Sequence, residues 1–136
     1  MVFFGKKQIE ELHHLYRANL VNSCSGYKSA NLIGTRSAEG VSNVAIFSSV
    51  MHLGSDPALL GFVLRPATVI RNTYDNIKKT KFYTINHILQ EILADAHHTS
   101  AKYDEKISEF DMTDLSEIFL EDFFAPFVNR APVKIG

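Results

Sequence analysis

Small hydroxyl and amide side chains gather between residues 42 and 76 of this chain, beside segments rich in apolar residues. Two arginines in the same stretch, Arg65 and Arg71, add a cluster of guanidinium charge. This mixture is compatible with a bound dianionic phosphate, which accepts hydrogen bonds from hydroxyls, backbone N–H groups and forked cations. The alternative is that the polar residues cap helices and form turns. The residues are Ser42, Asn43, Ser48, Ser49, Thr68, Asn72, Thr73 and Asn76.

The stretch after Pro66 predicts a helix over residues 68–79, because apolar residues recur at helical spacing and Lys78-Lys79 close the segment. Thr68 would then lie near the helix start, where the dipole and unpaired N–H groups favour an anion. A flat heteroaromatic ring attached to that anion would need apolar strands beside these donors. The residue types therefore allow a phosphate-bearing heteroaromatic ligand.

The segments around this stretch are predicted to form short strands and helices. Strands are expected at residues 30–36, 41–50, 59–64, 82–85 and 133–135, with a hairpin connection at 37–40 and a turn at Asp56-Pro57. The apolar run 59–64 is expected to be buried on both faces. Helices are expected at 8–20, with one buried face, and at 88–98 and 104–110. This pattern favours a mainly β fold, a barrel with flanking helices, over a parallel βαβ fold.

The composition indicates a single domain over residues 1–136 and argues against several kinds of partner. Lys+Arg 14 against Asp+Glu 15 give a net charge of -1, so no basic field attracts nucleic acid or an anionic membrane. No apolar run approaches the roughly 20 residues that span a bilayer. Cys24 is the only cysteine, which excludes an internal disulfide and fits a reducing cytoplasm. We therefore expect a cytoplasmic protein whose partner is a small molecule.

Other residues with chemical potential have simpler structural explanations. His13-His14 and His97-His98 are adjacent pairs whose members point in different directions on a helix, so solvated or capping roles are expected rather than metal binding. No acid–base pair stands out, and we predict no catalytic residue. An aromatic cluster near the end of the chain is expected to pack in the core, with a dimer surface as the alternative. This cluster consists of Phe119, Phe123, Phe124 and Phe127.

Four stretches of the sequence, read in order, are typical of one family. Residues 29–49 read S-A-N-L-I-G-T-R-S-A-E-G-V-S-N-V-A-I-F-S-S, and an Asp-Pro turn with an apolar strand follows at residues 55–62. An Arg-Pro…Thr-x-x-Asn-Ile stretch comes next, at residues 65–77, and Phe-Tyr-Thr-Ile-Asn closes the pattern at residues 82–86. The chain thus resembles the flavin reductase-like domain family, of flavin reductase and flavoredoxin type, whose fold is an FMN-binding split β-barrel.

The resemblance implies a six-stranded, Greek-key-like split barrel that holds FMN at the interface of a homodimer. Ser48 and Ser49 would meet the ribityl phosphate or the flavin edge, largely through backbone N–H groups. Asn43 and Asn86 would lie nearer the ring or support its loops. The residues around the phosphate and ribityl chain would be Arg65, Thr68, Arg71, Asn72 and Thr73.

The resemblance also implies an activity, that of an FMN-dependent oxidoreductase which passes a hydride from NADH or NADPH to flavin. In such enzymes the flavin performs the redox chemistry, while the protein supplies position and electrostatics. One alternative is an electron-carrier or flavin-storage module without NAD(P)H turnover, and another is a split barrel that binds a different heterocycle or haem. Because relatives continue through further strands after the position of Val133-Lys134-Ile135, we expect the last strands of the barrel to be missing.

Overall fold

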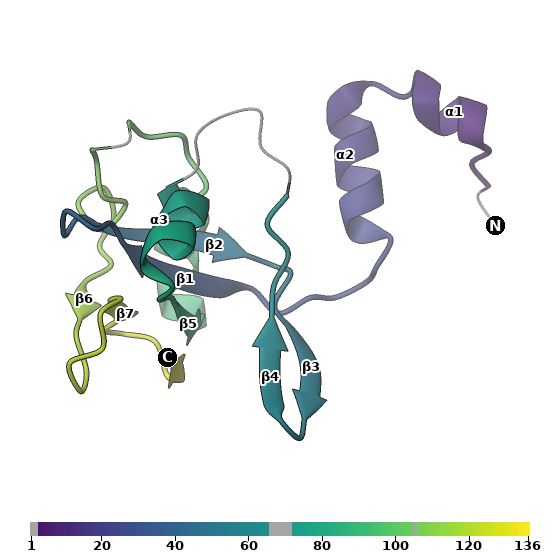
Figure 1. Cartoon of the computed structure of the whole chain (residues 1–136). Helices are drawn as coiled ribbons and strands as arrows, with labels where there is room; N and C mark the ends of the chain where they lie inside the picture. Colours follow the sequence, from purple (N-terminus) through teal and green to yellow (C-terminus); the bar gives the residue numbers. More distant parts are fainter. Residues whose placement is uncertain (1–2, 66–71, 105) are drawn as a thin grey trace.

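The computed structural model describes residues 3–65, 72–104 and 106–136, in which three antiparallel sheets form (Figure 1). The main sheet has the order β2-β1-β5-β8, from β2 (Ser42–Phe47), β1 (Asn31–Arg36), β5 (Thr84–His87) and β8 (Lys134–Ile135). β3 (Met51–Ser55) pairs with β4 (Ala58–Gly61), and β6 (Glu117–Ile118) pairs with β7 (Phe127–Val128). Within the described residues these sheets do not close, so the described part alone does not make the expected six-stranded Greek-key barrel.

β1 is the central strand of the fold because it pairs with a neighbour on each side. Its Ile33 lies opposite Ala45 of β2 and opposite Ile85 of β5. Because β1 is paired on both sides and covered on both faces, it is buried from Asn31 to Thr35, although half of its residues are polar. The strands predicted at 30–36, 41–50 and 133–135 are confirmed with shorter bounds, and the one predicted at 82–85 is shifted to Thr84–His87.

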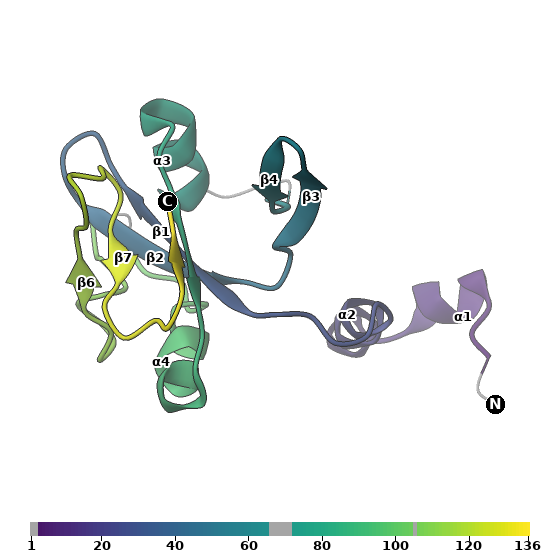
Figure 2. The same ribbon diagram turned by 90° about the horizontal axis from the view of Figure 1, so that it is seen from below.

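Helices cover the two faces of the main sheet. α3 (Asn72–Thr80) packs on β1 and β2, whereas α4 (Leu93–His98), preceded by the 3-10 turn η1 (Gln90–Ile92), lies on the opposite side (Figure 2). The helix predicted over 68–79 is confirmed for its described part, and the one predicted over 88–98 forms as η1 and α4. Strand alternation sends neighbouring side chains to opposite faces, so each helix meets every second residue of a strand.

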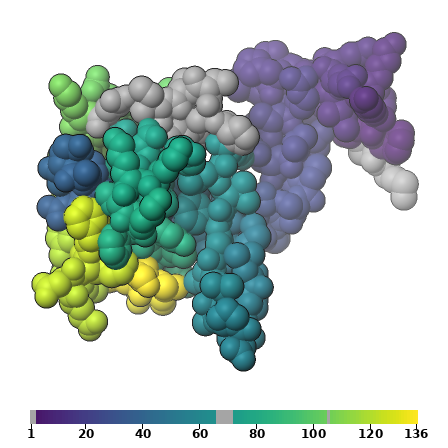
Figure 3. Space-filling view, in the orientation of Figure 1, coloured from purple at the N-terminus to yellow at the C-terminus, as the bar shows by residue number. Residues whose placement is uncertain are grey.

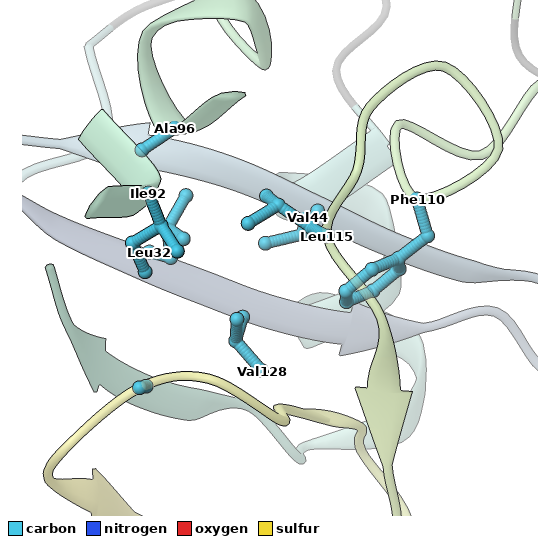
Figure 4. Packing of buried hydrophobic residues seen from close by; sticks show 8 residues of the cluster. Leu32, Val44, Ile92, Ala96, Phe110, Leu115 and Val128 are labelled. Carbon is cyan, nitrogen blue, oxygen red and sulfur yellow. The ribbon is translucent and has the colours of Figure 1, made fainter. Parts of the chain in front are cut away.

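The hydrophobic core lies on the α4 side of the sheet (Figure 4). Leu32 of β1 and Val44 of β2 contribute fully buried side chains to it. Apolar side chains from α4 and from the segments after it complete the cluster, so residues far apart in the sequence stabilise one face of the sheet. Those further members are Ile92, Ala96, Phe110, Leu115, Val128 and Ala131.

The N-terminal segment differs from the single helix predicted over residues 8–20. It forms two helices, α1 (Lys6–Glu11) and α2 (His14–Ser23), because Leu12 and His13 between them adopt extended ψ angles of 143° and 136°. Neither helix has a buried residue, so the predicted buried face is wrong. The cause is position, since both helices lie beside the body of the protein rather than on it (Figures 1 and 3).

The apolar run 59–64 is not a strand buried on both faces, and this prediction is also wrong. Only Leu59 to Gly61 belong to β4, which pairs with β3 in a ribbon that extends from the main sheet (Figure 3). Its only strand partner is β3 in the described residues, and Leu59 is 50% exposed. The predicted turn at Asp56-Pro57 is confirmed and joins the two strands.

The helix predicted over residues 104–110 is wrong, because the described part of this segment consists of turns and irregular backbone. Asp104 Oδ1 accepts a hydrogen bond from Lys106 N, and Ser108 Oγ accepts one from Phe110 N. Such local bonds from Asp and Ser side chains compete with helical hydrogen bonding. The turns place Ser108, Glu109 and Phe110 in succession in the interior, which a single helix face could not do.

The aromatic cluster is divided between the interior and the surface. Phe127 is buried, as the core-packing prediction requires, and its ring centroid lies 5.5 Å from that of Phe123, with the two ring planes tilted by 48°. Phe119 is exposed, and its ring lies 4.9 Å from the Arg36 guanidinium carbon in a cation–π contact. The cluster therefore joins the C-terminal segments to β1 instead of forming one apolar surface.

Candidate functional site

Two of the predicted site residues, Ser48 and Arg65, line one open cavity of about 520 Å³. Ser48 follows directly after β2, and Arg65 lies beyond the end of β4. The other wall comes from the last turn of α2, which contributes Asn22, and from the turn-rich segment after it, which contributes Lys28. The remaining lining residues are Ser23, Gly26 and Tyr27.

Hydrogen bonds hold the walls of this cavity together. Arg65 Nη2 donates to Asn22 Oδ1 at 3.1 Å, and Lys28 Nζ donates to the Asn22 carbonyl at 3.2 Å. Ser49 Oγ donates to the Val63 carbonyl at 3.1 Å and accepts from Val63 N at 3.2 Å. Ser49 thereby fixes the segment after β2 beside the segment after β4, which carries Arg65.

The chemistry of the lining suits an anion. It combines a guanidinium, an ammonium, hydroxyl groups and an amide, and no carboxylate is present among the described lining residues. An exposed guanidinium and ammonium that face one space attract a phosphate and can bind it through charge-assisted hydrogen bonds. The volume lies within the range of small-molecule sites. The residues present therefore fit the phosphate end of a flavin mononucleotide.

Thr73 and Asn43, two further predicted site residues, contact each other in the interior. Thr73 is in the first turn of α3 and Asn43 is on β2. We assign the Asn43 amide with its nitrogen toward Glu109, because the reverse would set amide and carboxylate oxygens together. Nδ2 then donates to Glu109 Oε2 at 3.1 Å, and Oδ1 accepts from Thr73 Oγ1 at 3.2 Å. A second link on the same helix face joins Asn76 Nδ2 to Thr35 Oγ1 at 3.2 Å.

Glu109 and Thr99 close the outer edge of β2. Because β2 is the last strand of the main sheet, its outward N–H groups have no strand partner among the described residues. Val44 N donates to Glu109 Oε2 at 3.2 Å, and Ile46 N donates to Thr99 Oγ1 at 3.0 Å. Side chains thus take the place of a fifth strand along this edge.

Asn86 is a fully buried residue of β5 with a complete set of partners. Its Nδ2 donates to the Leu32 carbonyl at 3.1 Å and to Thr84 Oγ1 at 2.9 Å. Its Oδ1 accepts from Val128 N at 2.9 Å, which joins β5 to β7. This geometry gives Asn86 a supporting position inside the sheet and not a position on a cavity wall.

Two predicted residues, Thr68 and Arg71, lie outside the described residues. Asn72 is partly buried at the start of α3. The structure therefore brings Ser48 together with Arg65, and Asn43 together with Thr73, as two separate groups. Sequence reasoning missed Lys28 and Asn22, although Lys28 directly precedes the family-like segment and Asn22 lies in the last turn of α2. It also missed Glu109, because this acidic residue between Ser108 and Phe110 belongs to no recognisable sequence pattern.

Burial raises the pKa of Glu109 above its ordinary value of 4.5, and hydrogen bonds from its own backbone and from Val44 oppose the shift in part. The folded protein then keeps a proton that the unfolded chain loses, so stability falls as pH rises from about 4.5 through the raised pKa. Glu109→Gln keeps an acceptor for Val44 and cannot ionise, so its stability should vary less in this window. Urea midpoints measured across the pH series check this, and equal slopes in both proteins would contradict it.

A second open cavity, of about 400 Å³, lies at the same end of the main sheet, where β1 begins and β2 ends. Its lining is largely apolar and comes from β3, β4, β5 and β8, with the segment before β1. Ile85, Leu60 and Met51 are typical members. This lining offers few charged groups, which distinguishes it from the cavity around Arg65.

The described residues contain no group of three or more His, Cys, Asp or Glu side chains placed to hold a metal ion. His98 Nε2 lies 3.0 Å from Tyr103 Oη, and His13 and His14 are exposed. In the same part of the chain, every helix is too short or too polar to cross a membrane.

Comparison with protein families supplies the deciding observation, because the model of the flavin reductase like domain matches residues 26–136. The chain belongs to this family. The match begins at Gly26, on the wall of the cavity around Arg65, and extends through all the strands. It confirms the resemblance inferred from the ordered sequence pieces.

Solved structures of known proteins are similar to this flavin reductase like chain. A candidate flavin reductase with a split barrel domain from Shewanella frigidimarina NCIMB 400 is 48% identical, with TM-score 0.93 over 98% of this chain and 66% of that one. Nitrilotriacetate monooxygenase component B from Bacillus cereus is 20% identical, with TM-score 0.82 over 98% and 65%. Flavoredoxin of Desulfovibrio vulgaris (Miyazaki F) is 22% identical, with TM-score 0.70 over 79% and 57%.

The chain spans about two thirds or less of the length of these structures. The two more distant likenesses show the fold alone, which is mostly β with helices. The protein from Shewanella frigidimarina has a split barrel domain. A comparison with curated proteins found no match.

Proposed function

We propose that this flavin reductase like protein is a cytoplasmic, FMN-dependent oxidoreductase that passes a hydride from NADH or NADPH to flavin. The observation that carries the proposal is the cavity that joins Ser48 to Arg65 and Lys28, within a chain of this family. Its cations and hydroxyl suit the phosphate that distinguishes FMN from riboflavin.

The proposed binding residues fall into two groups. Arg65 and Lys28 attract the phosphate, and the Ser48-Ser49 segment offers backbone N–H groups to the ribityl chain or the flavin edge. Thr68, Arg71 and Asn72 are proposed to contact the phosphate on the strength of their sequence pattern. Supporting roles are proposed for the buried Asn43, Thr73 and Asn86, whose hydrogen bonds connect the strands and α3.

The bound flavin would supply the redox chemistry by accepting a hydride from the nicotinamide and passing electrons onward. The residues of this chain bind and orient it. N–H groups of the segment after β2 would favour negative charge at the flavin edge, as preorganised donors do. No side chain has to move a proton in this scheme, in agreement with the absence of a predicted catalytic residue.

The proposal is tested by adding FMN or FAD to the purified protein and measuring bound flavin after desalting. We expect a yellow protein that holds FMN and whose flavin absorbance bleaches when NADH or NADPH is added without oxygen. Protein that takes up neither flavin would overturn the proposal, and tighter binding of FAD would overturn the choice of FMN.

An electron-carrier or flavin-storage module is the second candidate, and the similarity to flavoredoxin favours keeping it. Such a module shares the cavity but needs no nicotinamide. FMN that stays oxidised under NADH and NADPH, yet is reduced by dithionite, would support the module and not the reductase.

We further propose that the protein forms a homodimer through the β3–β4 ribbon. Leu53 and Leu59 on this ribbon are 61% and 50% exposed, and a second copy is a partner that would cover them. Leu53→Glu should shift the protein from dimer to monomer in sedimentation experiments, because a buried carboxylate would oppose the interface. Met112→Glu, a change at an exposed apolar residue on another segment, is the control. A monomeric wild-type protein would contradict this proposal.

A further inference from the structure

One buried carboxyl group connects two segments that the proposed function assigns to flavin binding. Glu109 is 9% exposed and comes from the turns after α4. It reaches the edge of β2 through Val44 N, and it reaches α3 through the Asn43 amide and the Thr73 hydroxyl. β2 leads into Ser48-Ser49, and α3 begins with Asn72 and Thr73.

The geometry is that of a relay with one acceptor at its centre. Glu109 Oε2 accepts from Val44 N at 3.2 Å and from Asn43 Nδ2 at 3.1 Å. The orientation of the Asn43 amide decides whether its oxygen faces the Thr73 hydroxyl, 3.2 Å away. An acceptor at position 109 therefore fixes this amide, and the amide in turn fixes the first turn of α3.

We propose that Glu109 is a positioning residue for the flavin phosphate, which sets the place of the α3 start relative to β2 through Asn43 and Thr73. This inference rests on the proposed function, since it takes the phosphate to lie between these segments. Glu109 itself touches no ligand in this scheme.

This role requires a hydrogen-bond acceptor at position 109 at the right distance from its donors, and the acceptor need not be charged. Removing it leaves Asn43 Nδ2 as a buried donor without its acceptor, and Val44 N keeps only Asn43 Oδ1, at 3.1 Å. This state favours rearrangement of the amide and of the helix start. A carboxamide at the same position keeps an oxygen in place. The relay therefore predicts opposite outcomes for Glu109→Ala and Glu109→Gln.

The experiment measures dissociation constants of FMN and riboflavin for the full chain, well below each variant's melting temperature. Glu109→Ala is expected to weaken FMN about tenfold, while riboflavin, which lacks the phosphate, changes much less. Glu109→Gln should restore FMN affinity to within about twofold of wild type. If Glu109→Ala does not fold, Glu109→Asp replaces it, because it withdraws the acceptor by one methylene.

The control is Leu115→Ala, which removes a buried side chain from the core and cannot alter a hydrogen bond of the relay. It should lower the melting temperature and leave the ratio of FMN to riboflavin affinity unchanged. A wild-type protein that binds no flavin would overturn the proposed function and this inference together. A wild-type protein that binds FMN, with the same ratio retained in Glu109→Ala, or in Glu109→Asp where that replaces it, would overturn only the positioning role.

Discussion

Gly34→Ala should destabilise the protein by about 3 kcal/mol or more, enough to lower its melting temperature by roughly 10 °C or to prevent folding. A Cβ at position 34 would lie 2.2 Å from the Pro126 carbonyl oxygen and 2.6 Å from Thr84 Oγ1. Neither atom can move freely, since the Thr84 hydroxyl donates to that same carbonyl at 2.6 Å. Gly34 also lies in the central strand, between Val44 and Thr84, so a shift there disturbs both neighbouring strands.

Gly5→Ala is the matched control for this change. A Cβ at Gly5 meets its nearest atom, Gln8 Oε1, at 3.4 Å, which is an ordinary contact with a flexible side chain. Thermal unfolding followed by circular dichroism compares the two variants with wild type. A Gly34→Ala protein that melts within a degree or two of wild type would show that the Pro126 segment does not pack on β1 as described.

Arg65→Ala should weaken FMN binding by about tenfold to a hundredfold, since hydrogen bonds to charged groups contribute more than neutral ones. The guanidinium faces the cavity together with Lys28 and is partly oriented by Asn22 Oδ1 at 3.1 Å. Riboflavin affinity should change far less, because riboflavin has no phosphate for the guanidinium to bind. Titration calorimetry with both ligands measures the difference.

Arg130→Ala removes the same charge from an exposed position outside the cavity lining and serves as the control. Arg65→Lys should fall between wild type and Arg65→Ala, because an ammonium keeps the charge and loses the forked geometry. Equal losses of FMN and riboflavin affinity in Arg65→Ala would remove this residue from phosphate binding and leave it a structural role beside Asn22.

The sequence predicts the sheet well because its signals there are local. Residues 30–36 contain β1, which is buried on both faces, and the turn at 37–40 sets the pairing of β1 with β2. The ordered pieces between residues 29 and 86 also lead correctly to the family. Both results need only short-range patterns, which a single sequence contains.

Other features depend on tertiary contacts that no local pattern encodes. The helical spacing in residues 8–20 correctly indicates helix, but burial of one face requires a neighbour, and α2 has no buried residue. The apolar run at 59–64 has the composition of an interior strand, yet β4 pairs only with β3 among the described strands. In each case composition reports a preference for burial, whereas the arrangement of the whole chain decides whether it occurs.

The candidate site shows the same division. Ser48 and Arg65 could be named from the sequence because they belong to family-like pieces, and they line one cavity. Lys28 and Asn22 enter the cavity from a segment about twenty or more residues earlier, so only the fold brings them there. Glu109 is 65 residues from the strand that it contacts, and its role follows from hydrogen bonds that spacing cannot predict.

The side chains that bind the outward N–H groups of β2 come much later in the chain than β2 itself. During synthesis, this strand edge is therefore covered only after the β1–β2 hairpin can form. Thr99 and Glu109 follow the N–H groups they bind by 53 and 65 residues, whereas β1 precedes β2 directly. A nascent chain that has already made the β1–β2 hairpin therefore exposes one row of unpaired donors until these later residues emerge and dock. During that interval the edge can pair with a strand of another chain, the usual route to misassembly of β proteins.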